Sequence, residues 1–195
     1  NILEAMRETG VRNIVVSSTA AVYGIPKTMP ITENFYLDPI NTYGETKMFM
    51  ERMLADYARA YGISWTALRY FNAAGADPEC ETGERHDPET HLIPRALMAL
   101  DGRLPDFYVM GDDYPTPDGT CIRDYIHVDD LADAHLRALD YLMKGGETNW
   151  FNLGTGNGFS VKQIIEAAEK VTGMKAPVTY GPRREGDPTR LIADS

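Results

Sequence analysis

The sequence predicts an α/β fold built on a parallel sheet, and three observations support this. Strand-like runs alternate with helical patterns along most of the chain. The run 12–18 is rich in β-branched residues and ends in two serine hydroxyls, as a buried strand with a polar carboxyl end does. The helical pattern of 42–61 carries a tyrosine and a lysine four residues apart. Alternation of this kind is typical of parallel sheets covered by helices, which bind ligands beyond the carboxyl ends of their strands.

Four elements are expected in the first part of the chain: helix 1–9, strand 12–18, helix 42–61 and strand 64–71. Gly10 stands where a glycine commonly ends a helix. Thr42 is a suitable cap for the second helix, in which Phe49, Met53 and Tyr57 recur at every fourth position.

The rest of the chain continues the alternation with shorter elements. After a long loop over 72–90 we expect helix 91–101, strand 107–110, strand 122–127, helix 128–143, strand 149–153, helix 160–172 and a strand near 178–180. Ser160 and Gln163 have the spacing of a capping box, and Gly173 ends that helix. The Pro, Gly and acidic residues of 72–91 indicate a boundary between two lobes, 1–72 and 73–195, with about 122–153 returning to the first.

Composition limits the classes of function. The chain has 19 basic and 29 acidic residues, and its net charge of -10 argues against general binding to nucleic acid or to anionic membranes. Cys80 and Cys121 have no CxxC spacing, which favours a reducing, cytoplasmic setting. No apolar run approaches the roughly 18 residues of a membrane span. The chain starts without Met inside a helical pattern, so we expect an interior piece of a longer protein.

The segment Tyr43-Gly-Glu-Thr-Lys47 is the most informative motif. Residues four apart share one helix face, and an ammonium beside a phenol favours the phenolate, which is then able to act as a general base. A single Tyr-x-x-x-Lys match is common on solvated helices. Thr19, however, follows strand 12–18 at its carboxyl end, so a hydroxyl is expected close to the pair.

Three further segments combine charge with strand ends or loops. Asn72 follows strand 64–71, either at the ligand edge of the sheet or simply in a turn. Arg123 lies in an apolar run, where a guanidinium needs an anion or a carboxylate partner such as Asp124. The loop 182–187 holds two arginines and an aspartate, which suit phosphate oxygens and sugar hydroxyls, or form a surface charge cluster.

Two other patterns are less convincing. Gly154-Thr-Gly156-Asn-Gly158 fails as a dinucleotide fingerprint, because Phe159 takes the third glycine position, and a tight turn is expected instead. A group of potential metal ligands lacks standard zinc spacing, so we expect solvated loop charges and no metal. This group comprises Cys80, His86, Asp87, Glu89 and His91, with His127, Asp129 and Asp130 elsewhere.

These motifs together resemble the extended short-chain dehydrogenase/reductase family, and the whole chain is similar to its UDP-glucose 4-epimerase branch. The resemblance implies a partial Rossmann-like, doubly wound parallel sheet with a smaller C-terminal substrate-binding lobe. It is carried by Ser17–Gly24, Tyr43–Lys47, Arg69–Asn72, His91–Pro94, Gly111–Thr120, Arg123–His127 and Arg183–Asp187.

The resemblance implies a role for each matching residue. Tyr43 matches the catalytic base, Lys47 its partner, and Thr19 the hydroxyl that binds the reacting sugar oxygen. The implied cofactor-binding residues are Ser17, Ser18, Tyr43, Lys47 and Tyr70. The implied substrate-binding residues are Thr19, Phe71, Asn72, His91, Leu92, Tyr108, Met110, Arg123, Arg184 and Asp187.

The implied activity is that of an isomerase with tightly bound NAD, which interconverts UDP-galactose and UDP-glucose at C4 through a 4-keto sugar. The resemblance also implies a homodimer formed through helix 42–61. Other UDP-sugars (N-acetylhexosamine, pentose or uronate) stay open, and Leu191 bears on the N-acetyl forms. A 4,6-dehydratase is disfavoured because Ala20 and Ala21 stand where such enzymes have an acidic pair. A non-catalytic nucleotide-binding regulator and a truncated, inactive piece are the remaining alternatives.

Overall fold

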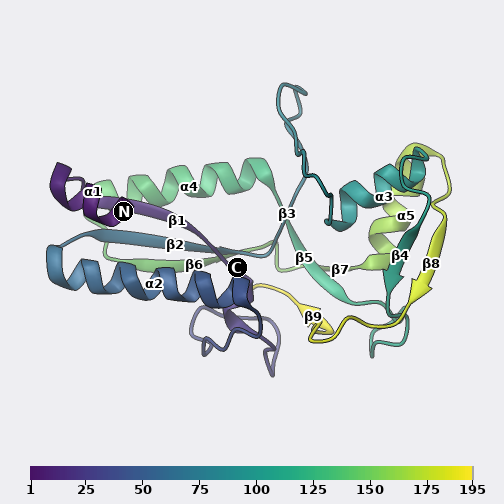
Figure 1. Ribbon diagram of the computed structural model, residues 1–195, viewed down its shortest axis with the longest axis horizontal. Helices are drawn as coiled ribbons and strands as arrows, with labels where there is room; N and C mark the ends of the chain where they lie inside the picture. The colour runs from purple at the N-terminus through teal and green to yellow at the C-terminus, as the bar shows by residue number, and fades with distance from the viewer. Residues whose placement is uncertain (195) are drawn as a thin grey trace.

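A three-stranded parallel sheet organises the N-terminal lobe in the computed structural model, which describes residues 1–194. Its strands are β1 (Asn13–Thr19), β2 (Ser64–Tyr70) and β6 (Asn149–Leu153), with β2 in the centre. The helices α2 (Thr42–Tyr61) and α4 (Val128–Met143) lie on opposite sides of this sheet, as Figure 1 shows, and α1 (Ile2–Thr9) packs on α2. The predicted α/β class is confirmed.

The second lobe is built around β5 (Ile122–His127), which pairs with three short strands. These are β3 (Asn72–Ala74), β7 (Gly158–Ser160) and β9 (Arg190–Leu191), of which only β7 is antiparallel to β5. A separate parallel pair, β4 (Phe107–Met110) with β8 (Val178–Gly181), packs with α3 (Leu92–Leu100) and α5 (Val161–Thr172). Figure 1 shows this lobe beside the sheet, with the loop before α3 projecting between the two.

The ends of the helices follow the sequence closely. Gly10 and Gly173 adopt left-handed conformations after α1 and α5, and Ser160 forms the predicted capping box with Gln163. The cap predicted for α2 was wrong by one residue. Asn41 is the cap, because its backbone is extended and its amide oxygen accepts the N–H of Gly44 at 2.8 Å.

The central strand β2 is buried along almost its whole length, from Trp65 to Arg69. It is covered on both faces, and strands of that kind have near-continuous apolar sequences. Leu54 of α2 packs against Trp65 and Ala67, which seats the helix on the sheet. No helix among residues 1–194 is long and apolar enough to cross a membrane.

A buried carboxylate, that of Asp124, joins β5 to two other segments. It accepts the backbone N–H groups of Thr155 and Gly156 at 2.9 and 3.1 Å, and that of Ala193 at 3.1 Å. The Thr155 hydroxyl donates to it as well. The turn after β6 therefore directs N–H groups at a protein carboxylate, which agrees with a tight structural turn and not with a dinucleotide fingerprint.

We predict that Asp124→Ala lowers the free energy of unfolding by about 2–5 kcal/mol, because buried N–H groups lose their acceptor. Urea denaturation measures this change. Asp133→Ala is the matched control, since Asp133 is exposed and pairs only with Arg137 on the same helix. A loss no larger for Asp124→Ala than for the control would contradict the assignment.

Candidate active site at two adjoining cavities

Two cavities of about 700 and 660 Å³ adjoin each other between the lobes. We call the larger one, lined by residues of the second lobe, the C-terminal cavity. The smaller one, at the carboxyl end of β1 and β2, is the sheet-edge cavity. They share a wall formed by residues 72–76 together with Gly83, Glu84 and His91. A ligand longer than either cavity is thus able to occupy both.

The sheet-edge cavity brings together the hydroxyl and the phenol that the sequence singled out. Thr19 ends β1, and Tyr43 lies in the first turn of α2 with 53% of its surface exposed. Tyr70 and Phe71, from the end of β2, line the same space. The Thr19 hydroxyl accepts the N–H of Ala21 at 3.2 Å and keeps its own proton available for donation.

Lys47 is held against the sheet one helical turn beyond Tyr43. Its Nζ donates to the carbonyl oxygen of Ser17 at 2.8 Å and lies 5.8 Å from the centre of the Tyr43 ring. An ammonium has three donors, so two more remain for other partners. The positive charge therefore lies close to both the phenol and the carboxyl end of β1.

The side chains of Ser17 and Ser18 contact helices. Ser17 Oγ lies 3.1 Å from Nε2 of His135 on α4, and the fully buried Ser18 donates to Glu51 of α2 at 2.5 Å. Ser17, Ser18 and Lys47 lie outside the walls of these two cavities. Any cofactor contact of Ser18 has to come from its backbone, because its hydroxyl is committed to Glu51.

The C-terminal cavity combines apolar walls with two guanidinium groups. Arg123 donates to Asp187 and to the carbonyl oxygen of Ile122, the latter at 2.8 Å. Its carboxylate partner is thus Asp187 and not Asp124. Arg184 lines the same cavity, whereas Arg183 turns to Asp113, at 2.6 Å, and stacks on Tyr114.

Burial raises the pKa of two further titratable groups of this cavity, Tyr125 and Cys121. It raises the pKa of the Tyr125 phenol to about 12, so that group stays protonated and is able to donate a hydrogen bond. Burial also raises the pKa of the Cys121 thiol, which disfavours a reactive thiolate there. The charged groups available to an anionic ligand are therefore the arginines.

The structure places all ten predicted substrate-binding residues on the walls of these two cavities. Thr19 and Phe71 line the sheet-edge cavity, and Asn72 and His91 lie in the shared wall. The C-terminal cavity takes the other six, which are Leu92, Tyr108, Met110, Arg123, Arg184 and Asp187. Their individual roles stay predictions. Tyr125 and Glu84 also line this space and had not been singled out.

A buried ion pair beneath the site was missed at the sequence level. Arg69 of β2 donates to both carboxylate oxygens of Glu51, at 3.0 and 2.5 Å, and the two side chains are 4% and 5% exposed. Burial disfavours the charged guanidinium, but the hydrogen bonds that Arg69 donates to Glu51 and Tyr23, together with its electrostatic attraction to both groups, outweigh burial and raise the pKa of Arg69. Two signals pointed to this pair: Glu51 continues the four-residue spacing of Tyr43 and Lys47, and Arg69 interrupts an apolar strand.

The ion pair is the centre of a larger network. Arg69 also donates to the Tyr23 hydroxyl at 3.0 Å, and Tyr23 donates to Asn152 of β6 at 2.7 Å. The Ser18 hydroxyl of β1 completes it by donating to Glu51. All three strands of the sheet are thereby connected to α2.

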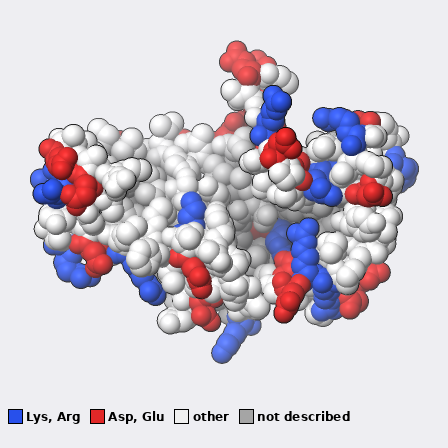
Figure 2. Space-filling model, viewed as in Figure 1, with Lys and Arg blue, Asp and Glu red and all other residues white. Residues whose placement is uncertain are grey.

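Charges of both signs occur on the face shown in Figure 2. Acidic side chains gather at the tip of the loop that projects between the lobes, with basic ones below them, and side chains of both signs lie along the lower edge of the second lobe. The arginines of the C-terminal cavity give the acidic chain a local site for an anion.

Comparison with known proteins gives consistent results. Residues 1–154 match the model of the NAD-dependent epimerase/dehydratase family. A UDP-glucose 4-epimerase from Streptococcus mutans is 55% identical over 194 residues, which cover 100% of this chain and 58% of that protein. The chain thus spans a little under three-fifths of the length of the curated relatives it matches.

Solved structures agree in fold. The UDP-glucose 4-epimerase from Brucella ovis in complex with NAD has a TM-score of 0.96 and 55% identity, covering 99% of this chain and 59% of that one. The enzyme from Bifidobacterium longum, in complex with NAD+ and UDP, has a TM-score of 0.92 and 41% identity, covering 100% and 58%. The Rossmann-like fold expected from the sequence is confirmed.

We predict that Glu51→Leu alone lowers the free energy of unfolding by about 3–5 kcal/mol, because it leaves a buried guanidinium without its carboxylate. The double variant Glu51→Leu/Arg69→Met removes both charges and recovers most of that loss. A double-mutant cycle measured by urea denaturation checks both statements. Additive losses would show that the two side chains do not form a coupled buried pair.

Proposed function

The chain belongs to the NAD-dependent epimerase/dehydratase family, and from this we propose that the complete protein interconverts UDP-galactose and UDP-glucose by reversible epimerisation at C4. The observation that carries the proposal is the pair of adjoining cavities. Thr19 and Tyr43 line one, and Arg123 and Arg184 line the other. Proton-transfer groups and anion-binding groups therefore face one continuous space, as a nucleotide sugar requires.

The residues at the carboxyl end of β1 suit a dinucleotide with ribose hydroxyls. Lys47 offers two unused donors beside the Ser17 carbonyl oxygen, and Tyr70 lines the neighbouring cavity. We propose that Ser17, Ser18, Tyr43, Lys47 and Tyr70 hold NAD, with Ser18 contributing through its backbone. When bound, NAD supplies a reversible acceptor for the hydride of the sugar C4.

Tyr43 is the proposed general base, which takes the proton from the sugar O4 and later returns it. Thr19 donates its hydroxyl proton to the same oxygen and fixes its position. Lys47 stabilises the negative charge on the phenolate oxygen. The 4-keto sugar then turns within the sheet-edge cavity, so that its opposite face is reduced and the configuration at C4 is inverted.

The nucleotide part of the substrate is assigned to the C-terminal cavity. Arg123 and Arg184 bind the diphosphate, and Asp187 accepts hydrogen bonds from the ribose. Leu92, Tyr108 and Met110 provide a flat apolar surface for uracil, with His91 beside it. Phe71 and Asn72, at the junction of the cavities, lie along the sugar and the diphosphate.

We further propose that residues 1–72 belong to the NAD-binding lobe and 73–195 mainly to the substrate lobe, with about 122–153 returning to the first. Phe49 and Met53 of α2 are 60% and 41% exposed, which supports a homodimer formed through this helix. Both cysteines are free thiols, in keeping with a cytoplasmic enzyme.

Another UDP-sugar is the second candidate substrate. Leu191 packs against the cluster that contains Tyr23 and Phe71, so its size affects the room next to Phe71 in the sheet-edge cavity. N-acetylated sugars need extra space there. Dehydration has no support, because Ala20 and Ala21 carry no group able to act as acid or base.

We predict that Tyr43→Phe lowers turnover by about 10²–10⁴-fold in the complete protein, because the general base is removed. Bound NAD is retained, as its absorbance in the purified protein will show. Tyr36→Phe, at an exposed tyrosine outside both cavities, is the control and keeps wild-type turnover. Near wild-type rates for Tyr43→Phe would disprove the proposed chemistry.

We predict that Arg184→Gln raises the Kd for UDP by roughly 10- to 100-fold, because one charge-assisted hydrogen bond to the diphosphate is lost. Isothermal titration calorimetry measures this directly. Arg137→Gln removes an exposed arginine that pairs only with Asp133 and leaves the Kd unchanged. If both variants bound UDP with the same Kd, Arg184 would not contact the diphosphate.

A further inference from the structure

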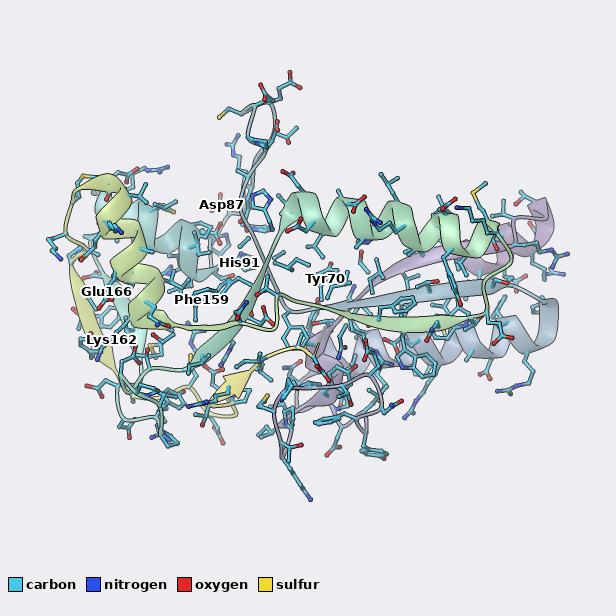
Figure 3. All side chains as sticks on the ribbon, turned by 180° about the vertical axis from the view of Figure 1, so that it is seen from behind. Tyr70, Asp87, His91, Phe159, Lys162 and Glu166 are labelled. Carbon is cyan, nitrogen blue, oxygen red and sulfur yellow. The ribbon has the colours of Figure 1, made fainter. Side chains whose placement is uncertain are left out.

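Four side chains with metal-ligating atoms converge at the foot of the projecting loop. They are Glu84, His86, Glu89 and His91, and their ligand atoms all lie within 4.8 Å of one another. Figure 3 shows His91 where this loop rejoins the body, with Asp87 in the neck of the loop above it. Nothing in the proposed epimerisation requires the two glutamates or His86.

The nitrogen and oxygen atoms of the four side chains already lie in contact or close to it. Nδ1 of His86 lies 2.7 Å from Glu84 Oε1 and 3.8 Å from Glu89 Oε2. Nδ1 of His91 lies 3.0 Å from Glu84 Oε1 and 2.9 Å from Glu89 Oε1. Zinc bonds to His nitrogen and carboxylate oxygen of roughly 2.0–2.2 Å place ligand atoms about 3.3–3.6 Å apart in a tetrahedron. Three of the four observed separations are shorter than this, two of them as hydrogen bonds, and the fourth is longer. A bound ion therefore replaces these hydrogen bonds and moves the ligand atoms slightly apart.

The backbone holds one side chain of the cluster, Glu89, in place before any ion binds. Glu89 Oε1 accepts the backbone N–H groups of Thr90 and His91, both at 2.7 Å, and its side chain is only 8% exposed. The two imidazoles are 54% exposed, with ring centres 4.9 Å apart, so an ion is able to enter from solvent. One carboxylate is therefore held in place beside two imidazoles that an ion is able to reach.

The arrangement differs from an ordinary histidine–carboxylate contact. His127, a third histidine, faces the single carboxylate of Asp129 at 3.5 Å. In the cluster, by contrast, both imidazoles direct Nδ1 at the same two carboxylates. A divalent cation replaces the protons that otherwise fill these nitrogen–oxygen contacts, and its two positive charges are opposite in sign to those of two carboxylates.

We propose that Glu84, His86, Glu89 and His91 form a binding site for a divalent transition-metal ion of the zinc type. Mixed imidazole and carboxylate ligands suit Zn²⁺ better than Mg²⁺ or Ca²⁺, which prefer oxygen alone. The ion joins residues 84–89 of the loop to His91, the residue that precedes α3. Since Glu84 and His91 line both cavities, the metal lies at the rim of the proposed active site and takes no part in hydride transfer.

The test is a titration of the complete, metal-free protein with CoCl₂, followed by visible absorption, and with ZnCl₂, followed by calorimetry. We expect one equivalent of metal per chain and the strong visible bands of four-coordinate Co²⁺. His86→Gln and His91→Gln each weaken binding by about 10–100-fold, the cost typical of a perturbed metal site. His127→Gln is the matched control and binds like the wild type.

His86 is exposed and lies in a loop, so His86→Gln is expected to fold normally, which circular dichroism checks. Binding of Zn²⁺ only at millimolar concentration would overturn the proposal. The same holds if His86→Gln binds as tightly as the wild type, or if His127→Gln abolishes the Co²⁺ bands. All of these readouts are independent of epimerase activity, so they stand or fall separately from the proposed function.

Discussion

The guanidinium of Arg69 and the carboxylate of Glu51 meet between β2 and α2, where neither side chain is more than 5% exposed. Removing two charges from water costs several kcal/mol for each ion, and this cost is offset only when the geometry is good and the remaining donors and acceptors have partners. Here two hydrogen bonds join the charges directly. The Ser18 hydroxyl donates a further hydrogen bond to Glu51, and the Tyr23 hydroxyl accepts one from Arg69. The pair thereby fixes how α2 lies on the sheet. Lys47 and Tyr43 stand one and two turns before Glu51 on this helix, so their positions relative to β1 depend on it.

A second buried carboxylate fixes the opposite side of the site. Asp124 holds the turn after β6 and the C-terminal segment against β5 by accepting hydrogen bonds from three backbone N–H groups and the Thr155 hydroxyl. Arg123, the residue before it, lines the C-terminal cavity and pairs with Asp187. Proton-transfer groups are positioned by the Glu51 network, and anion-binding groups by the strand that carries Asp124.

How far the sequence predicts this arrangement depends on the range of each interaction. The spacing of Tyr43 and Lys47, the capping box at Ser160 and the buried run of β2 are local, and each was predicted. The strands β3, β7 and β9 have two or three residues and exist only because β5 pairs with them, so they leave no periodic signal. Asp124 was considered as the partner of Arg123, yet consecutive strand residues point to opposite faces. The true partner, Asp187, is 64 residues away, and only the folded chain brings it there.

The most direct test is to incubate the complete protein with UDP-galactose in D₂O, without added NAD, and to analyse the product by NMR. If the C4 hydride leaves the sugar and returns to it, UDP-glucose accumulates over many turnovers per bound NAD, and its C4 keeps the original hydrogen. Deuterium at C4 would mean that the carbon exchanges a proton with solvent, and absence of UDP-glucose would mean that the substrate is different. Either result would contradict epimerisation by internal hydride return at the site formed by Thr19, Tyr43 and Lys47.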